Sequence, residues 1–445
     1  MIEKFLSFFK KNFVPRPLYE FAQPIYHYLL AFLGALFYGF PSRQLIVIGV
    51  TGTKGKTTTC NLIAQILNAA GLKTGMATTV NFRIGDREWV NKTKQTMLGR
   101  FQLQKLLHQM VKEDCLYAVV ETSSEGILQY RHRFIDYSVA VFTNLSPEHI
   151  ERHGSFENYR LAKMKLFEQV AQEKNGVGVY NFDDANVKYF LEPKVAAQHV
   201  YTLRLKDPLV QIHNLHQVLN IKSMPAGTTF LLDREKFEMS LIGEMNVYNA
   251  AAAICVALSQ NIPMAKIKKA LLKAKAPAGR LEFVDKGQNF KIVIDYAHEP
   301  TSLEAVYKTI INSKLKTKNS KLICLLGSQG GGRDKWKRAE MGKIAAKYCD
   351  KIILTNEDPY DENPAAILND IEAGFSQNQK SKIKNQKYWK IIDGREAIKK
   401  AVSLAKRDDV AILTGKGGEV WMCVKNGKKI PWDERAIVEE ILEGL

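Results

Sequence analysis

Short apolar runs alternate with helical patterns along most of the chain, and the clearest of these runs is Leu45 to Val50. It is rich in β-branched residues and has no polar side chain, which is typical of a parallel strand covered on both faces. Apolar residues then recur at helical spacing from Cys60 to Ala70, and Gly71 follows as a helix end. The pattern predicts a buried strand that runs through a glycine-rich loop into a helix.

The same alternation continues to about residue 277. We predict a helix at 101–112, strands at 116–120 and 138–142, short strands and turns over 190–243, and an alanine-rich helix at 246–260. Alternating strands and helices are typical of a doubly wound α/β domain with a parallel sheet. Residues 44–277 are therefore predicted to form one such domain.

The pattern breaks at the sequence Ala-Pro-Ala-Gly-Arg that ends at Arg280, and a second alternating set follows. Its strands are predicted at 291–295, 322–326, 351–355 and 410–414. Each of them ends in polar or glycine-rich sequence, as expected where ligands bind at the carboxyl ends of parallel strands. The predicted fold class is α/β, with a central P-loop ATPase-like doubly wound domain (44–277) followed by a second Rossmann-like domain (278–445).

The loop after the first strand has the composition of a phosphate-binding loop, since residues 52–59 read Gly-Thr-Lys-Gly-Lys-Thr-Thr-Thr. Gly52 and Gly55 would let the backbone approach phosphate oxygens, and Lys56 would reach the terminal phosphates. Thr57 would offer its hydroxyl to Mg²⁺. The motif is shorter than the usual Gly-x-x-x-x-Gly-Lys-Ser/Thr pattern, because Val50 stands where that pattern has its first glycine. We expect ATP or a similar nucleotide to bind here.

Polar residues after the next predicted strands extend this site. Glu121 follows one strand, Thr143 and Asn144 follow another, and the segment beyond them carries His149 and Lys163. Such a segment alone is typical of a solvated helix. Directly after a strand end, in a domain with a phosphate loop, a metal or phosphate role is favoured.

Composition and charge limit the class of protein. Apolar residues make up 46% and charged residues 25% of the 445-residue chain, as in ordinary globular proteins. The formal charge of +18 would attract an anionic nucleotide or an anionic membrane surface, whereas no nucleic-acid-binding module is visible. The six cysteines occur singly, so we expect free thiols in a reducing cytoplasm, without a zinc site or a disulfide framework.

Residues 1–43 are predicted to form an N-terminal helical segment. A basic, aromatic start precedes a helix that Pro24 can begin and Pro41 can end. The apolar stretch between the prolines, about 16 residues, is shorter than the ~20 needed to span a bilayer, and no signal-peptide cleavage site follows it. Two interpretations stay open, a cap packed on the protein's own core and a helix lying in a membrane interface.

Nine short motifs occur in a fixed order: TGTKGKTTT, ETSS followed by QYR, TNLSPEHIERHG, the AK of RLAKMKLF, MNVYNAAAA, AGRLE, DYAHEP, GGGRDKWKR and GKGGE. In this order they resemble the Mur ligase family, most closely its MurE branch, the UDP-N-acetylmuramoyl-tripeptide synthetases. The resemblance implies an enzyme that joins a carboxylate to an amine at the expense of ATP. The carboxylate attacks the γ-phosphate to give an acyl phosphate, and the amine then displaces phosphate to leave an amide. Such chemistry depends on positioning and on cations around the phosphates.

The resemblance assigns catalytic and metal-binding roles in the central domain. Lys56 would hold the β- and γ-phosphates, and Thr57 and Glu121 would bind one Mg²⁺. His149 and Lys163 would bind a second Mg²⁺, with Lys163 carbamylated as in the family. A carbamate supplies an oxygen ligand that an ammonium group cannot.

Two larger sets of residues follow from the same motifs. The ATP-binding set is Gly52, Thr53, Lys54, Gly55, Lys56, Thr57, Thr58, Asn249, Arg280 and Asp295. The substrate-binding set is Thr96, Ser123, Gln129, Arg131, Glu357, Asp358, Tyr360, Lys416 and Glu419. The implied substrates are a nucleotide-sugar peptide and an amino acid, with ATP and Mg²⁺ as cofactors. We expect a monomer in the cytoplasm, with the inner membrane surface as an alternative location.

The sequence departs from the family in four of its motifs. Glu125 stands where histidine is usual, Glu148 replaces an aspartate, and Gly418 replaces the histidine of GKGHE. Tyr360 replaces the arginine of the D-N-P-R signature, which forms a bidentate pair with the distal carboxylate of meso-diaminopimelate. The added amino acid is therefore expected to be lysine, ornithine or another amine.

Two carboxylates of the same region, Asp358 and Glu419, are available for the amino groups of such a substrate. The UDP-binding domain that precedes the phosphate loop in MurE proteins is expected to be missing, since about 45 residues come before the loop. Two alternatives therefore stay open, a ligase like folylpolyglutamate synthase and a MurT-like ligase acting on a non-UDP, lipid-linked substrate. A nucleotide-binding scaffold without activity is disfavoured, because the four catalytic residues are all present.

Overall fold

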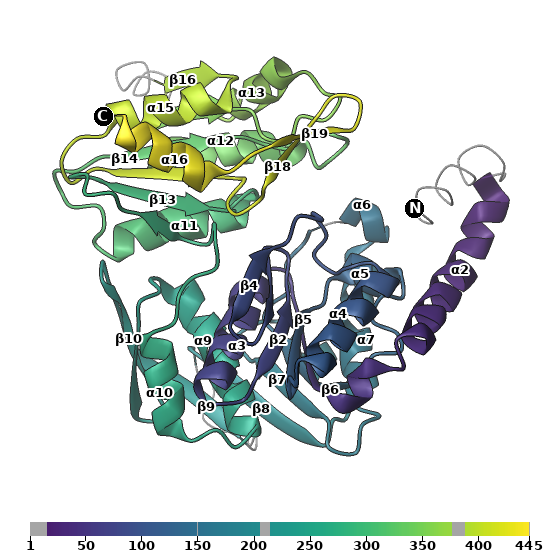
Figure 1. The fold of residues 1–445 in the computed structure, drawn as a ribbon. Helices are drawn as coiled ribbons and strands as arrows, with labels where there is room; N and C mark the ends of the chain where they lie inside the picture. Colours follow the sequence, from purple (N-terminus) through teal and green to yellow (C-terminus); the bar gives the residue numbers. More distant parts are fainter. Residues whose placement is uncertain (1–15, 149, 205–213, 376–387, 445) are drawn as a thin grey trace. The chain divides into compact units, whose positions relative to one another are not determined.

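The structure is a computed structural model that describes residues 16–148, 150–204, 214–375 and 388–444. The chain forms two compact units, both of α/β type (Figure 1). Unit 1 contains Met1–His216 and Ala252–Ile267, and unit 2 contains Gln217–Ala251 and Lys268–Leu445. Strand β9 (Leu215–Met224) and helices α9 (Glu244–Ser259) and α10 (Met264–Leu272) run across this division. The division at residue 277, which rests on motifs, stays a prediction.

The sheet of unit 1 is centred on β1 (Ile46–Thr51), which pairs in parallel with β5 (Tyr117–Glu121) on one side and β6 (Tyr137–Phe142) on the other. The strand order is β8-β7-β6-β1-β5-β2-β3-β4, with antiparallel pairing only at β2–β3 and β3–β4. The carboxyl ends of β1, β5 and β6 therefore meet at one edge of the sheet, where open α/β sheets bind ligands. The other strands are β2 (Thr74–Ala77), β3 (Asn81–Ile84), β4 (Arg87–Val90), β7 (Val177–Asn181) and β8 (Ala197–Thr202).

The helices of unit 1 are α3 (Lys56–Ala69), α4 (Arg100–Lys112), α5 (Ser124–Leu128), α6 (Ile150–His153), α7 (Phe156–Val170) and α8 (Val187–Phe190), with a 3₁₀ turn at Pro41–Gln44 before β1. Two of them correspond to predicted ones: α4 begins one residue before its predicted start, and α3 begins four residues before the predicted Cys60. One apolar cluster packs α4 and α7 onto the strands. The strand residues in it are almost all buried, as predicted for a sheet covered on both faces.

Unit 2 has a six-stranded sheet in the order β12-β13-β17-β14-β15-β16, with only the β12–β13 pair antiparallel. Four of its strands have the predicted bounds: β13 (Lys291–Asp295), β14 (Leu322–Leu326), β15 (Lys351–Thr355) and β17 (Val410–Thr414). Two separate apolar clusters contain residues from alternate positions of these strands, as expected for a sheet with helices on both faces. The remaining elements are β9 (Leu215–Met224), β10 (Gly227–Leu232) and β11 (Glu235–Met239), which form an antiparallel meander, β12 (Glu282–Val284), α11 (Pro300–Asn312), α12 (Trp336–Tyr348), α13 (Pro364–Glu372), β16 (Tyr388–Ile391), α15 (Gly394–Leu404), the hairpin β18 (Trp421–Val424) and β19 (Lys428–Pro431), and α16 (Glu434–Glu443).

The prediction of six free thiols is wrong for two of them. Cys324 in β14 and Cys349 just before β15 form a disulfide, with 2.09 Å between the sulfur atoms and 6.0 Å between the Cα atoms. The two strands are parallel neighbours, so residues that are 25 positions apart in the sequence lie side by side. Strand pairing, which the spacing of single cysteines does not reveal, accounts for the difference.

The N-terminal helix α2 (Arg16–Phe37) does not begin at Pro24, so this prediction is wrong. Pro24 lies inside the helix, because a proline removes one backbone hydrogen bond and bends a helix without having to end it. The helix ends before Pro41: Gly39 takes a left-handed φ of 71°, and the N–H of Phe40 donates to the carbonyl of Ala35 at 2.8 Å. The basic, aromatic start at residues 1–15 lies outside the described residues.

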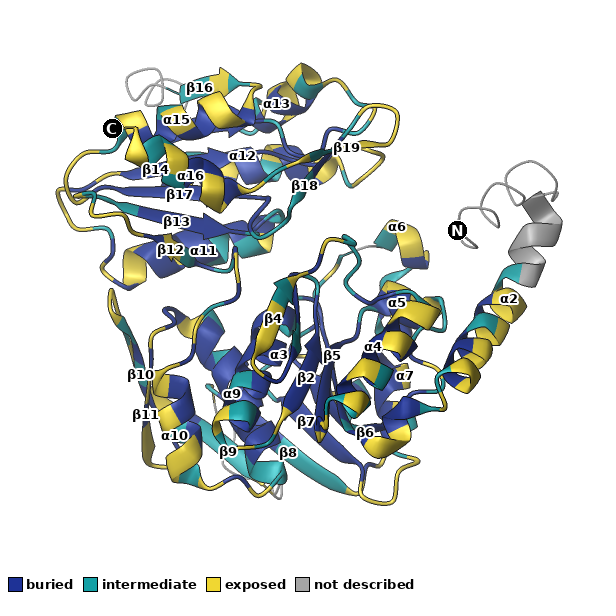
Figure 2. Ribbon diagram, viewed as in Figure 1, coloured by how far each residue is buried: buried dark blue, intermediate teal, exposed yellow. Residues whose placement is uncertain are grey.

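Helix α2 packs on α4 through its small residues. Ala31 and Ala35 are buried, and a Cβ atom added to Gly34 would lie 3.5 Å from the Cα of Phe101. Much of α2 is coloured as exposed in Figure 2. The exposed residues include the large apolar ones: Ile25, Tyr26, Tyr28, Leu29, Phe32, Leu33, Leu36 and Phe37. Within the described parts of the chain, no helix is long and apolar enough to cross a bilayer.

The packing of α2 on α4 can be tested by enlarging its contact face. We expect Gly34→Leu to lower the free energy of unfolding by roughly 1–3 kcal/mol, because the added atoms would overlap the backbone of α4 at Arg100 and Phe101. Chemical denaturation measures the change. Leu33→Ala, on the exposed face, is the control and should change the free energy by less than about 0.5 kcal/mol. Equal losses in the two variants would contradict the assignment of the contact face.

Candidate active site

The loop after β1 has a backbone conformation that requires glycine. Gly52 has a φ of 144°, and a Cβ atom there would lie 2.0 Å from the hydroxyl oxygen of Thr143. Thr143 and Asn144, at the end of β6, fix the loop by hydrogen bonds. The Thr143 hydroxyl donates to the carbonyl of Lys54 at 2.7 Å, and the carbonyl of Asn144 accepts from the N–H of Thr53 at 2.8 Å. The end of β6, which was predicted to lie near this loop, therefore holds the loop in place.

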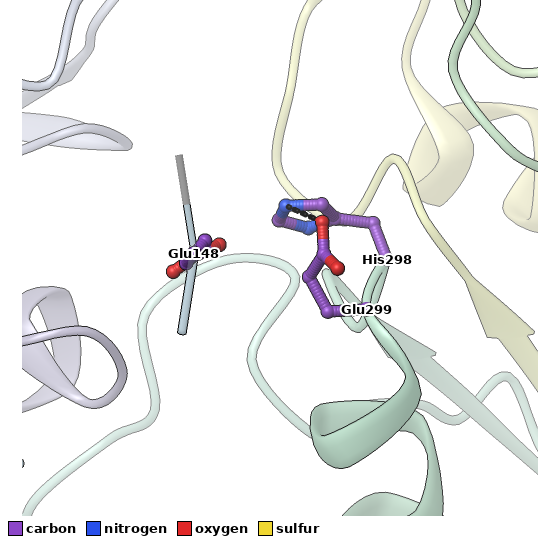
Figure 3. Close-up of side chains that lie close together, drawn as sticks. All are labelled: Glu148, His298 and Glu299. Carbon is purple, nitrogen blue, oxygen red and sulfur yellow. Dashed lines mark ion pairs between the residues drawn. The ribbon is translucent and has the colours of Figure 1, made fainter. Parts of the chain in front are cut away.

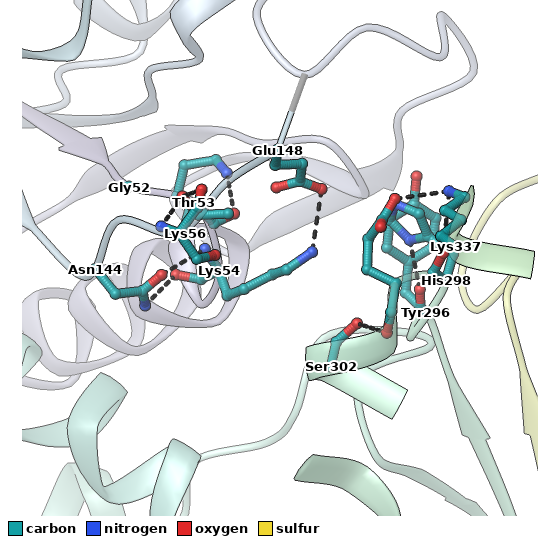
Figure 4. Close-up of polar contacts among 12 residues, drawn as sticks. Gly52, Thr53, Lys54, Lys56, Asn144, Glu148, Tyr296, His298, Ser302 and Lys337 are labelled. Atoms are coloured by element: carbon teal, nitrogen blue, oxygen red, sulfur yellow. Dashed lines mark hydrogen bonds and ion pairs between the residues drawn. The ribbon is translucent and has the colours of Figure 1, made fainter. Parts of the chain in front are cut away.

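Helix α3 begins immediately after the loop. Gly55, with a φ of 82°, is its N-cap, so the unpaired N–H groups of the first turn and the positive end of the helix dipole lie next to the loop. The Lys56 ammonium donates to the carbonyl of Thr53 at 2.9 Å (Figure 4). Thr57 and Thr58 are buried in the first turn. This arrangement suits an anionic ligand such as a nucleotide phosphate.

Glu121 ends β5 as a buried carboxylate beside the same helix. Its Oε2 accepts from the hydroxyl of Thr57 at 2.9 Å and from the backbone N–H of Thr79 at 2.8 Å. A hydroxyl and a carboxylate oxygen are the hard ligands that Mg²⁺ prefers, so this pair fits such an ion. Thr79 belongs to none of the nine motifs, so its contact with Glu121 could not be predicted from the sequence.

Lys163, on α7, is 1% exposed, and its Nζ donates to the carbonyl of Gly52 at 2.7 Å. Burial, and secondly the charge of Lys56, lower the pKa of this amine well below its ordinary value, while Glu148 and Glu121 act in the opposite direction. Burial without a directly bonded carboxylate thus favours the neutral amine. The structure brings Lys163 and the phosphate loop into contact, as the predicted site requires.

Tyr159 is a contact of the loop that the sequence analysis missed. Its hydroxyl lies 3.0 Å from that of Thr53, and its ring lies 4.5 Å from the Nζ of Lys163. Tyr159 and Lys163 are four residues apart on one helix and so share a face. That spacing is the signal by which the contact could have been found.

Glu148 takes part in the same region through an ion pair. Its Oε1 lies 3.0 Å from the Nζ of Lys54, while the N–H of Lys54 donates to the side chain of Asn144 at 2.9 Å (Figure 4). The lysine is thus held at both its backbone and its side chain. His149, a predicted metal ligand, lies outside the described residues.

The predicted substrate residues of unit 1 gather around α5. The guanidinium of Arg131 donates to the side-chain oxygens of Gln129 at 2.7 Å and Gln95 at 3.2 Å. Ser123 caps the helix by accepting from a backbone N–H at 3.1 Å, and Thr96 is half-buried in the segment that also carries Gln95. Gln95 is an addition to the predicted set.

In unit 2, Arg280 and Asp295 lie on adjoining segments. The Arg280 guanidinium sits 4.2 Å over the ring of Tyr296, whose hydroxyl donates to Glu419 at 3.2 Å. Asp295 accepts from two backbone N–H groups at 2.8 Å, which fixes the turn after β13. Asn249, on α9, donates to Asn246 at 3.1 Å and is not among these contacts.

The turn after β13 continues in a second polar group that the sequence analysis did not single out. His298 Nε2 lies 4.0 Å from the carboxylate of Glu299 (Figure 3). Glu299 accepts from the Lys337 ammonium at 2.6 Å, and the backbone carbonyl of Tyr296 accepts from His298 Nδ1 at 2.8 Å (Figure 4). Lys337 belongs to the motif GGGRDKWKR, so this contact joins two of the nine motifs.

Lys416 is the centre of a buried network at the carboxyl end of the sheet of unit 2. Its ammonium lies 3.0 Å from Asp358 and 2.6 Å from Glu419, and it also donates to the carbonyl of Trp421 at 2.7 Å. Asp358 accepts in addition from the N–H of Cys423 at 2.6 Å. Both carboxylates that were expected to receive an amine are thus paired with Lys416.

Glu357 and Glu434 are buried carboxyl groups beside this network. Both side-chain oxygens of Glu357 and Oε2 of Glu434 have no hydrogen-bond partner within the described parts of the chain. Burial raises the pKa of Glu357 to about 7 and that of Glu434 to about 8. Gly415, with a φ of 114°, leaves room for Glu357, because a Cβ atom there would lie 2.2 Å from its carboxylate. Glu434 has no signal in the motifs, since only the fold brings its helix to this end of the sheet.

Comparison with protein families identifies the family to which the chain belongs. Residues 50–257 match the Mur ligase middle domain, and residues 279–417 match the domain described as Mur ligase, glutamate ligase domain. The chain belongs to the Mur ligase family. This membership confirms the predicted α/β fold class and makes the protein an ATP-dependent ligase.

Individual relatives agree with this result. The chain is 35% identical over 421 residues to UDP-N-acetylmuramoyl-L-alanyl-D-glutamate–2,6-diaminopimelate ligase of Syntrophomonas wolfei subsp. wolfei, covering 93% of this Mur ligase and 82% of that protein. A solved structure of a ligase with the same name is 29% identical, with a TM-score of 0.60 over 90% of this chain and 78% of the other. A folylpolyglutamate synthase of Mycobacterium tuberculosis shares the fold with a TM-score of 0.67, at 17% identity over 87% of this chain and 92% of the other.

The burial of Glu434 predicts a pH-dependent stability. Its pKa is about 8 in the folded protein against an ordinary value of 4.5, so its contribution is present below pH 4.5 and is lost as the pH rises through 8. Against Glu434→Gln, the wild-type free energy of unfolding should fall by roughly 1–4 kcal/mol over this range. Denaturation at a series of pH values measures it. Glu443→Gln, exposed on the same helix, is the control; parallel curves for wild type and Glu434→Gln would rule out a buried protonated carboxyl.

Proposed function

We propose that this Mur ligase adds an amino acid to a muramoyl peptide, a peptidoglycan precursor. The observation that carries the proposal is the contact of the buried Lys163 amine with the Gly52 carbonyl of the phosphate loop. It joins two motifs that are 111 residues apart in one phosphate and metal site. The names of the relatives at 35–37% identity support this class of substrate.

The residues of unit 1 would bind ATP and Mg²⁺. Lys56 and the N-terminus of α3 would hold the phosphates, Thr57 and Glu121 would bind one Mg²⁺, and His149 would bind a second together with Lys163. Bound Mg²⁺ would offset phosphate charge and so favour attack on phosphorus by the substrate carboxylate. The loop and helix donors, held in place before the substrate arrives, would stabilise the charge that develops on the transferred phosphoryl group.

The environment of Lys163 supports its carbamylation. A lowered pKa supplies the neutral amine, whose nitrogen lone pair forms a bond to the carbon of CO₂. One C=O π electron pair moves onto oxygen at the same time, and the nitrogen loses one proton to solvent. The product carries one negative charge in place of the ammonium. It therefore offers oxygen ligands to Mg²⁺ beside the phosphate loop.

For the added amino acid, Glu357 is the best acceptor of a side-chain ammonium group. Its oxygens have no partner among the described residues, whereas Asp358 and Glu419 are paired with Lys416. Tyr360 stands in place of the arginine that would bind a distal carboxylate. Lysine, ornithine or a similar diamine therefore fits better than meso-diaminopimelate, although several relatives are named for the latter.

The remaining assignments belong to the same proposal. The acceptor is a nucleotide-sugar peptide, and a lipid-linked acceptor of the MurT type is the alternative. The enzyme is a monomer of the cytoplasm, with peripheral membrane contact through residues 1–43. A folylpolyglutamate activity is disfavoured, because the solved synthase shares the fold at only 17% identity.

The reaction itself is tested by phosphate release. We expect release that requires both a muramoyl peptide and an amino acid, and Lys56→Ala should lower the rate by ~10² or more, because a preorganised charge is removed. Lys73→Ala, an exposed lysine of the same unit, should keep the rate. Turnover of ATP that ignores the acceptor would refute the proposal.

Carbamylation is tested by chemical rescue. Lys163→Ala should lose ~10² in rate and regain part of it with a small carboxylate such as formate, which can supply the missing oxygen ligand. Lys165→Ala, exposed two residues further along α7, should behave as wild type. Failure of rescue together with an unmodified lysine mass in the native protein under bicarbonate would contradict the carbamate.

The role of Glu357 is tested by the pH dependence of amino-acid binding. Since its pKa is about 7, the KM for lysine should rise as the pH falls below 7, by up to about tenfold per unit, and Glu357→Gln should remove this dependence. Asp361→Asn, exposed in the same loop, serves as the matched control. Selective use of meso-diaminopimelate over lysine would refute the assignment.

A further inference from the structure

We propose that the exposed face of α2 is a lipid-docking ridge that holds this ligase on the surface of an anionic bilayer. The ridge consists of the eight large apolar side chains Ile25, Tyr26, Tyr28, Leu29, Phe32, Leu33, Leu36 and Phe37. This proposal goes beyond the ligase reaction, and its test does not use ligase activity.

The distribution of side chains on α2 is the reverse of that on an ordinary surface helix. A surface helix turns its large apolar side chains toward the protein and polar ones toward water. In α2 the small residues Ala31, Gly34 and Ala35 face α4, while Phe37 is 75% and Leu36 is 53% exposed. At 100° per residue the eight exposed residues occupy about half of the helix circumference. A continuous exposed apolar face of this kind marks a binding surface.

Aromatic contacts join one edge of the ridge to the rest of unit 1. Tyr28 makes edge-to-face contacts with Tyr130 at 6.0 Å and with Phe134 at 5.1 Å between ring centroids. Phe32 contacts Phe134 in the same way at 5.4 Å. Such contacts fix the rotation of α2 about its axis, so its outward face is a defined surface of the folded protein.

Charge identifies the partner. Residues 21–42 contain no lysine, arginine, aspartate or glutamate. The residues before this stretch are basic overall, with Lys4, Lys10, Lys11 and Arg16 against Glu3 and Glu20, and Arg43 follows it. The Arg43 side chain is 67% exposed. An apolar helix face between basic residues suits insertion among acyl chains with the cations at anionic headgroups. The tyrosines of the ridge suit the same interface.

A second copy of the chain fits the ridge less well. Pairing two ridges would bring together two chains that each carry a formal charge of +18. Helix pairs in water also carry charged side chains along the edges of their apolar seam, and α2 has none in its described ridge. The bilayer is therefore the occupant that the observations favour.

The test is co-sedimentation of the full-length protein with vesicles of phosphatidylglycerol and phosphatidylcholine. We expect binding that strengthens as salt is lowered and is at least ~10-fold weaker to phosphatidylcholine alone. The variant Leu29→Gln, Leu33→Gln, Leu36→Gln should weaken binding by ~10-fold or more. Its fold is checked by chemical denaturation, in which its free energy of unfolding should match that of the wild type within about 0.5 kcal/mol per substitution.

The matched control carries the same three changes at exposed leucines elsewhere, Leu116→Gln, Leu219→Gln and Leu272→Gln, and should bind as the wild type. No binding by the wild type, or equal losses in both triple variants, would overturn the proposal. So would a ridge variant that alters the oligomeric state without any lipid binding, because the occupant would then be a second copy.

A site-specific probe gives an independent measurement. The four cysteines outside the disulfide are buried, so Leu33→Cys introduces an exposed thiol that can be labelled with a polarity-sensitive fluorophore. Its emission should shift to the blue on addition of anionic vesicles, while the label on Leu272→Cys should not respond. A shift at both positions, or at neither, would contradict docking through α2.

Discussion

The contact between Gly52 and the end of β6 is the constraint on which the nucleotide site depends. A Cβ atom at Gly52 would overlap the Thr143 hydroxyl at 2.0 Å, so the loop follows its course only with glycine. The same approach lets Thr143 and Asn144 hold the loop and lets Lys163 reach the Gly52 carbonyl at 2.7 Å. A larger residue would therefore disturb the loop, its scaffold and the buried amine together. The loop, the end of β6 and Lys163 on α7 therefore form a single site, although they are far apart in the sequence.

In unit 2, several carboxyl groups are buried around the ammonium group of Lys416. Lys416 pairs with Asp358 and Glu419, and the neighbouring Glu357 and Glu434 have raised pKa values because burial leaves their charged forms poorly solvated. A single ammonium does not neutralise four carboxyl groups. An incoming cationic group would supply further positive charge, so under the proposed function this network would favour an amine substrate, and its binding would be coupled to proton release from Glu357.

Much of the fold could be predicted from the sequence, and the reasons are local. Strands such as β13 and β17 are buried on both faces, so each contains an apolar run that marks its position, and polar residues stand at the ends of the runs. The contacts within the site could not be predicted in the same way, because they join residues that are far apart in the sequence. The Cys324–Cys349 disulfide follows from the neighbouring positions of β14 and β15, and the contact of Thr79 with Glu121 arises from a backbone N–H that no side chain reveals. Pro24 was misjudged because a proline only weakens a helix that tertiary contacts stabilise.

The N-terminal helix shows why composition alone did not separate a core helix from a surface one. Apolar residues cover all sides of α2, and periodicity therefore gave no preferred face. Size provided the missing distinction: Ala31, Gly34 and Ala35 recur at spacings of three, one and four residues and permit close approach to α4. The larger side chains cannot enter that contact and are left outside. A stripe of small residues on an apolar helix thus identifies the side that packs on protein, and by elimination the side that is available to another apolar phase.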